Sequence, residues 1–355
     1  MSEKVLMKGN EALAEAAIMA GCHHYFGYPI TPQTEVAAYM SKRMPKIDGG
    51  VFLQAESEIA AINMVIGVAS TGKRVMTSSS SPGVSLKSEG ISYLAGCDLP
   101  ALIVNVQRGG PGLGGIQPSQ SDYFHATRGA GHGDFHLLVL APASVQEMVN
   151  LTFKAFDLAE KYRMPAMILS DGTMGQMMEP VSLEQGEIKQ YDKSWALTGT
   201  KGEREPNIIN SLFLKPDELE KFNFDRFKRY AIIEENEQLY EEYMMDDAEI
   251  CIVAFGVAAR VSQNAIDEAR KKGIKVGMIR PITLWPFPKT VLNAAADKVK
   301  AFISVELNMG QMIEDIELAT RCKKPVYLCN RTGGMIPTTQ NVLDKIEKVN
   351  KGGVQ

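Results

Sequence analysis

Short apolar runs alternate with amphipathic helical patterns through the first half of this chain, and this alternation constrains the fold more than any other feature. The runs expected to be strands are HYFG (24–27), VFLQA (51–55), RVMTSSS (74–80), ALIVNVQ (101–107), HLLVLAP (136–142) and PAMILSD (165–171). Helical patterns lie between them over 8–21, 35–44, 56–70, 85–96 and 144–162. Strands that alternate with helices form a parallel sheet with helices on both faces. The sequence therefore predicts an α/β fold with a doubly wound parallel sheet.

The alternation stops after about residue 180 and resumes in a smaller second unit. Turn residues and charges fill the intervening segment, which predicts an extended connection with one helix. The second unit has expected strands at 249–256, 275–281 and 300–308 and an amphipathic helix at 259–273. We therefore predict domains at 1–190 and 247–355, with a linker containing a helix at 191–246. A length of 355 residues fits two or three domains.

Composition excludes several classes of function. A formal net charge of −4 gives no global positive field for nucleic acid. No apolar run approaches the roughly 18 residues of a membrane span, and the N-terminal segment lacks the pattern of a signal peptide. We expect a cytoplasmic protein that contacts neither nucleic acid nor membrane.

The cysteines are scattered, and none form a CxxC pair. They are Cys22, Cys97, Cys251, Cys322 and Cys329. Zinc sites and iron–sulfur clusters draw on closely spaced cysteines. We therefore expect no metal site and no iron–sulfur cluster in this chain, and we interpret the cysteines as mostly buried small apolar residues.

Polar and conformationally restricted residues follow each expected strand of the first unit. In open parallel sheets, ligands bind beyond the carboxyl ends of the strands. The segments found there are Tyr28-Pro29-Ile30-Thr31-Pro32, Glu56-Ser57-Glu58, Ser81-Pro82-Gly83, Arg108 with the glycine-rich stretch GGPGLGG, and Asp171-Gly172. They should converge at one edge of the sheet, as in a small-molecule site.

Each of these residues also has a purely structural interpretation. Thr31 before a proline is a good helix N-cap, and glutamates in a first helical turn favour the helix dipole. Arg108 at a strand end could form a surface ion pair, and residues 80–83 could be a simple turn. The location of all of them at one edge favours the functional interpretation.

Two other motifs do not support a ligand site. The glycines of GGPGLGG match the dinucleotide-binding spacing, but Pro118 follows early and no apolar helix begins at Gly115. His132 and His136 have no further histidine or cysteine near them in the sequence. We interpret both histidines as structural.

The combination and order of YPITP, ESEIAAI, TSSSSPG, VQRGGPGLGG and PSQSDYF resemble the α subunit of the 2-oxoacid:ferredoxin oxidoreductases. The resemblance covers the first 180 residues and resumes in the C-terminal unit. It is strongest to the branched-chain form, which acts on 3-methyl-2-oxobutanoate. Family members usually have EDE where this chain has Glu56-Ser57-Glu58, and commonly GPSTG where it has GPGLG.

The resemblance implies a thiamine diphosphate enzyme in which this chain supplies the pyrimidine-side domain. Glu58, rather than Glu56, matches the glutamate that activates the cofactor by sharing a proton with its aminopyrimidine ring. Thr31 and Arg108 match residues on the substrate side, where Arg108 would bind the 2-oxoacid carboxylate. The implied catalytic residues are Glu58, Thr31 and Arg108, and the implied cofactor-binding residues are Pro29, Thr31, Glu58, Ser81 and Gly83.

Two absences, of a GDG motif and of clustered cysteines, imply that this chain is half of an active site. Family chains that bind the diphosphate contain GDG, which helps to hold Mg²⁺, and this chain has no GDG. The resemblance therefore places diphosphate and Mg²⁺ on a β subunit, and the iron–sulfur clusters on partner subunits, including a ferredoxin-like subunit beside a γ subunit. Coenzyme A, the 2-oxoacid and ferredoxin complete the expected partners. The smaller domain resembles the C-terminal domain of transketolases.

The implied reaction is the oxidative decarboxylation of a 2-oxoacid to acyl-coenzyme A and CO₂, with electrons passed to ferredoxin. Three alternatives stay open at this point. The substrate could be 2-oxoglutarate or pyruvate, or the chain could be a non-catalytic assembly subunit. A stand-alone lyase or transketolase would need GDG in the same chain.

Overall fold

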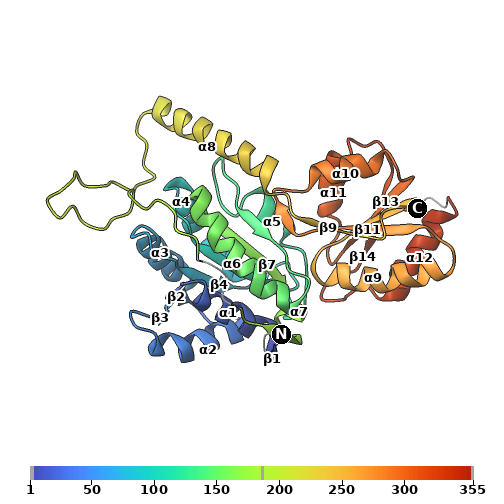
Figure 1. The fold of residues 1–355 in the computed structure, drawn as a ribbon, viewed down its shortest axis with the longest axis horizontal. Coiled ribbons are helices and arrows are strands. Elements are labelled where there is room, and N and C mark those ends of the chain that lie inside the picture. Colours follow the sequence, from blue (N-terminus) through green and yellow to red (C-terminus); the bar gives the residue numbers. More distant parts are fainter. Residues whose placement is uncertain (1–3, 185–187, 353–355) are drawn as a thin grey trace.

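The computed structural model describes residues 4–184 and 188–352, which form two sheet-containing units joined by an extended segment and a long helix (Figure 1). The first sheet has seven strands in the order β12-β6-β7-β5-β4-β2-β3. Their bounds are β2 His24–Gly27, β3 Val51–Gln54, β4 Met76–Ser79, β5 Leu102–Gln107, β6 Leu138–Leu140, β7 Ala166–Asp171 and β12 Thr283–Trp285.

The strands β2 to β7 of this sheet are parallel, as the sequence predicts. Every residue of β5 and β7 is buried, so both faces of the sheet centre are covered. The covering helices form two groups: α3 (Glu58–Ala69) packs on α4 (Ser81–Gly96), and α1 (Gly9–Met19) packs on α2 (Thr34–Arg43) and α6 (Val145–Tyr162). The predicted α/β doubly wound fold is confirmed.

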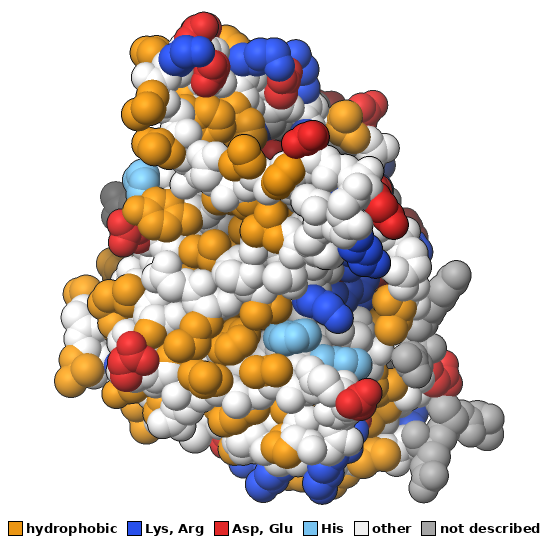
Figure 2. All heavy atoms as spheres, turned by 90° about the vertical axis from the view of Figure 1, so that its left-hand side faces the viewer, with side chains coloured by type: hydrophobic (Ala, Val, Ile, Leu, Met, Phe, Trp, Pro, Cys, Tyr) orange, Lys and Arg blue, Asp and Glu red, His pale blue; other side chains and the backbone are white. Residues whose placement is uncertain are grey.

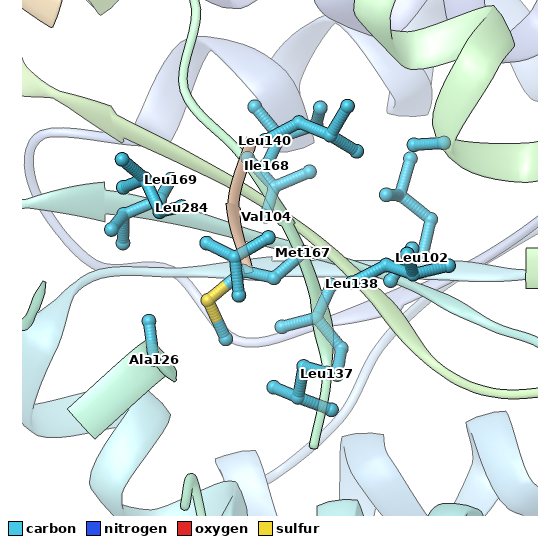
Figure 3. Close-up of a cluster of buried hydrophobic side chains, with 14 of the residues drawn as sticks. Leu102, Val104, Ala126, Leu137, Leu138, Leu140, Met167, Ile168, Leu169 and Leu284 are labelled. Carbon is cyan, nitrogen blue, oxygen red and sulfur yellow. The ribbon is translucent and has the colours of Figure 1, made fainter. Parts of the chain in front are cut away.

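The core of the first unit lies on β5, β6 and β7 (Figure 3). Parallel strands buried on both faces read as continuous apolar runs, because both side-chain directions meet helices. The core side chains labelled in Figure 3 are Leu102, Val104, Ala126, Leu137, Leu138, Leu140, Met167, Ile168, Leu169 and Leu284. Leu284 comes from the second half of the sequence, so the two units share a core.

Four elements of the first unit differ from the prediction. β12 pairs antiparallel with β6, although its residues lie within the segment expected to form the second domain. Lys4–Lys8 (β1) pairs antiparallel with Met178–Ser182 (β8) in a separate ribbon, and neither strand was predicted. The helix expected from residue 85 begins at Ser81, since Pro82 occupies its first turn, where a proline is tolerated.

The second sheet has the order β14-β13-β10-β11-β9. Its strands are β9 Tyr240–Tyr243, β10 Ile250–Val253, β11 Val276–Pro281, β13 Ala301–Glu306 and β14 Val326–Asn330. β9, within the expected linker, pairs antiparallel with β11, and the other pairs are parallel. The helices of this unit are α9 Gly256–Lys271, α10 Lys289–Ala296, α11 Met312–Ala319 and α12 Thr339–Asn350.

The segment between the units contains α8 (Pro216–Asn236), in agreement with the single helix expected there. The elements of the described residues also include the short helices α5 (Tyr123–Arg128) and α7 (Gly172–Gln176) and the 3₁₀ turn η1 (Met44–Lys46). The expected outer domain limits, residues 1 and 355, lie outside the described residues. Within the described ranges, no helix combines the length and apolar character that a membrane span requires.

His136 packs among aromatic rings beside α8. Its ring stacks on Trp285 with centroids 4.7 Å apart and lies 5.5 Å from the ring of Tyr230. Burial lowers the pKa of this histidine. The structural interpretation of His136 is therefore supported by its contacts, while His132 is exposed in the preceding loop.

Candidate active site

Residues predicted from the strand ends lie in contact at the carboxyl edge of the first sheet. Nη1 of Arg108, after β5, donates to the backbone oxygen of Thr31, after β2, at 2.9 Å. The Arg108 backbone in turn bonds the hydroxyl of Ser81, in the first turn of α4. Gly83 lies in that same turn and adjoins Glu58, which begins α3. Four separate loops therefore form one site.

Glu58 is a buried carboxyl group at the start of α3. Ser57 caps this helix by accepting a hydrogen bond from the backbone of Ala60 at 3.1 Å. Glu58 is 6% exposed, and no described residue donates a hydrogen bond to it or forms an ion pair with it. Glu56, two residues earlier, is exposed. A helix-dipole role would suit either glutamate, but a buried carboxyl group without a hydrogen-bond donor indicates a ligand.

Because Gly83 has no side chain, the side chain of Glu58 can occupy the space beside it. A Cβ atom on Gly83 would lie 2.7 Å from Oε1 of Glu58 and would overlap the hydroxyl of Ser79. Because the close neighbours are a carboxylate and a hydroxyl in a packed turn, a larger residue would displace the catalytic candidate. The structure thus brings Gly83 and Glu58 together.

We expect Gly83→Ala to lower the free energy of unfolding by about 1–3 kcal/mol, because the added methyl group overpacks this turn. Gly67→Ala is the matched control: Gly67 is exposed within α3, and a Cβ there would meet no atom within 4 Å. That control should raise stability slightly, since alanine favours helices. Chemical denaturation of both variants is the measurement. Equal effects of the two substitutions would contradict the close approach of Gly83 to Glu58.

Arg108 is a buried cation without a carboxylate partner among the described residues. It is 7% exposed. Besides its bond to Thr31, Nη2 donates to the backbone oxygen of Leu113 at 3.1 Å, while the buried Nε has no partner in the described part of the chain. The alternative of a surface ion pair is therefore wrong. A buried arginine that lacks an acidic partner is suited to an anionic ligand.

The turn after β2 is fixed by side chains on its inner side. Gln33 is fully buried, accepts a hydrogen bond from the hydroxyl of Ser78 and donates to the backbone oxygen of Tyr28 at 3.3 Å. Asn10 donates to the backbone oxygen of Pro32 at 2.9 Å. The following helix begins at Thr34, so the N-cap interpretation of Thr31 is wrong.

The side chains of Thr31 and Pro29 are exposed in this turn. No hydrogen bond within the described chain involves the hydroxyl of Thr31, which leaves it available to a ligand. Ser81 differs, since its hydroxyl donates to Asp122 at 2.6 Å and is held by the backbone of Arg108. Ser81 thus positions Arg108 as well as lining the site, and a direct contact with a cofactor stays a prediction.

A polar network behind Ser81 was not anticipated from the sequence. Asn105 donates to Asp122 at 2.9 Å and accepts from the backbone nitrogen of Ser81 at 3.1 Å. Gln107 accepts from the backbone nitrogen of Asp122. A signal was present: an asparagine inside the apolar run ALIVNVQ must find a buried partner. The partner itself could not be identified without the fold.

The glycine-rich stretch closes on itself as a loop. Gly109 donates to the backbone oxygen of Gln117, and Gly115 donates to that of Gly109, both at 2.9 Å. Gly114 has φ +57°, and a Cβ there would overlap the oxygen of Gly109, so this close turn requires glycine. The next helix is the short α5, so no helix begins at Gly115 and the arrangement differs from a dinucleotide-binding turn.

A cavity of about 620 Å³ opens beside this loop, between the two units. The first unit contributes residues from the start of α4, the glycine loop and Asp122, and the second contributes Asn308, Met309, Gln311 and Thr332. The units are joined next to the cavity, where Asn308 donates to the backbone oxygen of Gln120 and Gln311 to that of Ser121. The cavity is large enough for part of a substrate.

Apolar side chains are exposed on the elements that carry Glu58 and its neighbours. β3 and α3 lie at the left of Figure 1, and Figure 2, which views that side, shows hydrophobic side chains gathered on it. Exposed apolar residues on β3, α3 and α4 and in the turn after β2 include Tyr28, Leu53, Ile59 and Leu86. Exposed apolar residues that form contiguous surface are typical of interaction sites.

The comparison with protein families decides which family the chain belongs to. Residues 15–245 match the family described as pyruvate flavodoxin/ferredoxin oxidoreductase, thiamine diphosphate-binding. Residues 248–342 match pyruvate:ferredoxin oxidoreductase core domain II. The first match alone covers more than half of the chain. The chain belongs to the 2-oxoacid:ferredoxin oxidoreductase family.

Curated members of the 2-oxoacid:ferredoxin oxidoreductase family match over nearly the whole chain. Ketoisovalerate oxidoreductase subunit VorB of Methanothermobacter thermautotrophicus is 52% identical over 97% of this chain and 97% of its own length. The 2-oxoglutarate synthase subunit KorA of the same organism is 35% identical over 99% of this chain and all of its own length. The resemblance deduced from the motifs is confirmed.

Solved structures agree with this assignment. The 2-oxoglutarate:ferredoxin oxidoreductase from Magnetococcus marinus, with 2-oxoglutarate, coenzyme A and succinyl-CoA bound, superimposes with a TM-score of 0.86 at 28% identity. It covers 98% of this chain, which spans 65% of that longer chain. A split-gene transketolase matches with a TM-score of 0.58 at 12% identity, and this match shows the fold alone.

Proposed function

We propose that this chain is the α subunit of an enzyme that oxidatively decarboxylates a branched-chain 2-oxoacid, 3-methyl-2-oxobutanoate. The overall reaction converts the 2-oxoacid and coenzyme A to acyl-coenzyme A, CO₂ and a proton, and passes two electrons one at a time to ferredoxin. The similarity to a ketoisovalerate oxidoreductase subunit over 97% of both chains supports the substrate class.

One observation carries the proposed chemistry. The carboxyl group of Glu58 is buried, receives no hydrogen bond from a described residue and lies against Gly83, where a side chain would exclude it. Nearby, the hydroxyls of Ser79 and Ser80 are buried without a partner in the same part of the chain. Buried polar groups without hydrogen-bond partners, gathered where Gly83 carries no side chain, fit a polar ligand such as an aminopyrimidine ring.

Thiamine diphosphate, when bound, supplies the carbon nucleophile and the electron sink that this decarboxylation needs. Glu58 would hold and release a proton on its carboxylate at the pyrimidine ring, as a carboxyl group positioned for acid–base catalysis does. Pro29 and Gly83 would orient the ring, with Ser81 fixing the first turn of α4.

The substrate side would be formed by Arg108 and Thr31. Arg108 would bind the carboxylate of the 2-oxoacid, because its guanidinium is buried without an acidic partner and is fixed by the carbonyl groups of Thr31 and Leu113. The exposed hydroxyl of Thr31 would donate a hydrogen bond to the keto oxygen. The glycine loop, which Arg108 anchors, would exclude water from the reacting carbon.

The remaining parts of the enzyme would come from partner subunits in the cytoplasm. A β subunit would hold the diphosphate and Mg²⁺, because this chain lacks the GDG element. The apolar surface around Tyr28, Leu53, Ile59 and Leu86 is suited to that contact. Iron–sulfur clusters would lie on partner subunits, including a ferredoxin-like subunit beside a γ subunit.

The purified chain alone should bind thiamine diphosphate weakly, whereas its complex with the partner subunits should bind it tightly and in a Mg²⁺-dependent manner. The reason is that the chain supplies only the pyrimidine side of the site. Isothermal titration calorimetry of both preparations is the measurement. Micromolar, Mg²⁺-dependent binding to the isolated chain would contradict the divided site, and absence of binding by the complex would contradict the enzyme class.

A further inference from the structure

Lys87, on α4, is a buried cation that the proposed chemistry does not yet use. Its side chain is 0% exposed, and its Nζ has no hydrogen-bond partner in the described parts of the chain. No ion pair joins it to a carboxylate there. Lysine is almost never fully buried unless it is paired, because transferring its charge out of water is unfavourable. An apolar residue would pack at this position without that cost, so the lysine requires an explanation.

The helix geometry directs Lys87 toward Glu58. Gly83, Lys87 and Gly90 lie on the face of α4 that packs on α3, since they are four and three residues apart. A Cβ on Gly83 would lie 2.7 Å from Oε1 of Glu58, and one on Gly90 would lie 2.5 Å from Cγ2 of Ile62. Helical side chains lean toward the N-terminus of their helix. The Lys87 side chain therefore leans from the α3–α4 interface toward Gly83 and the carboxyl group.

Charges on the neighbouring elements single out Glu58 as the partner. Burial lowers the pKa of Lys87 to about 8, and the negative charge of Glu58 acts in the opposite direction. Asp122 is bound by Ser81, and His125 faces Ser88 on another side of α4. Arg226 of α8 meets the far end of α4 at the backbone of Ala95. The strands beneath α4, β4 and β5, carry no ionisable side chains.

We propose that Lys87 is a positioning residue for the proposed catalytic residue Glu58: its amine supplies the charge that offsets burial and sets how tightly the carboxyl group holds its proton. In general, a carboxyl group buried without a nearby cation favours its neutral form, which cannot accept a proton. A nearby positive charge favours the ionised form, so a carboxyl group beside it can both accept and release a proton. This inference rests on the proposed function for the role of Glu58, but not for the charge coupling itself.

The direct test is the titration of Glu58 in the full chain, labelled with ¹³C at the glutamate side-chain carboxyl carbons. The Glu58 signal is assigned by its disappearance in Glu58→Gln. In Lys87→Met, which keeps the length of the side chain and removes its charge, the midpoint of this titration should rise by about one pH unit, equivalent to about tenfold tighter proton binding. Lys87→Arg, which keeps the charge, should leave the midpoint near that of the wild-type chain.

Ile91→Ala is the matched control, since Ile91 is fully buried one turn further along the same face of α4 and carries no charge. It should lower stability without moving the Glu58 midpoint. Lys87→Met should fold at least as stably as the wild-type chain, because an apolar side chain replaces an unpaired buried amine. An unchanged midpoint in Lys87→Met, or failure of both Lys87→Met and Lys87→Gln to fold, would overturn the proposal and leave a structural role.

The acid limb of the pH dependence of kcat in the assembled enzyme gives a second readout, and it should move upward in Lys87→Met. The two hypotheses fail separately. If Glu58→Gln retained full activity while the midpoint still moved in Lys87→Met, the charge coupling would stand and the catalytic role of Glu58 would be wrong.

Discussion

Glu58→Gln is expected to lower kcat of the assembled enzyme by about 10²–10⁴-fold, the usual contribution of a positioned acid–base group. Glutamine keeps the size of the side chain and its place against Gly83, but it cannot exchange a proton with the cofactor ring. The measurement is the turnover rate of the reconstituted complex with saturating 2-oxoacid and coenzyme A. Size-exclusion chromatography should show that the variant complex assembles normally.

Glu56→Gln is the matched control for this substitution. Glu56 lies two residues away and is exposed, so its loss should change turnover far less. A Glu58→Gln complex that retained more than about a tenth of wild-type turnover would contradict the assignment of Glu58, since acid–base catalysis contributes at least about 10²-fold. A large loss of turnover in Glu56→Gln with a small loss in Glu58→Gln would indicate that Glu56, and not Glu58, is the catalytic glutamate.

Arg108→Lys is expected to raise KM for the 2-oxoacid by about 10- to 150-fold, which corresponds to the loss of a charge-assisted hydrogen bond worth about 1.5–3 kcal/mol. Lysine keeps the charge, but it lacks the planar fork that bonds Thr31 and Leu113 at once. KM for coenzyme A should change much less, because the proposed contact involves only the carboxylate of the 2-oxoacid.

Arg43→Lys provides the control for a structural arginine. Arg43 lies on α2 and forms a two-pronged ion pair with Glu15 of α1, with nitrogen–oxygen distances of 2.6 and 2.9 Å. It has no predicted contact with substrate. Its replacement should leave both Michaelis constants unchanged. If Arg108→Lys lowered only the stability of the protein, or raised both Michaelis constants equally, Arg108 would not be the carboxylate-binding residue.

The edge of the sheet that carries the site could be predicted from the sequence because strand ends are local signals. Each apolar run ends at a polar or glycine-containing segment, and parallel strands place these segments together. Thr31, Gly83 and Arg108 are therefore found where the pattern places them. The burial of Glu58 relative to Glu56 could not be read from local pattern, since it depends on how α3 packs on α4; the family resemblance alone selected Glu58.

Contacts between distant segments account for what the sequence did not reveal. Leu284 joins the core of the first unit through β12, which pairs with β6 across more than a hundred residues of sequence. A three-residue strand carries too little periodicity to be recognised. Lys87 was missed for a related reason: an isolated lysine in a helical pattern is ordinarily a solvent-exposed residue, and only the two flanking glycines, Gly83 and Gly90, allow α3 to cover it.

The measurement that tests the central claim most directly is kcat/KM of the native complex for a panel of 2-oxoacids, with coenzyme A and an electron acceptor. The account predicts coenzyme A-dependent reduction of the acceptor, with the highest kcat/KM for 3-methyl-2-oxobutanoate and lower values for pyruvate and 2-oxoglutarate. A preference for 2-oxoglutarate or pyruvate would contradict the branched-chain assignment, and an absence of reduction with every 2-oxoacid would contradict a catalytic role for the chain.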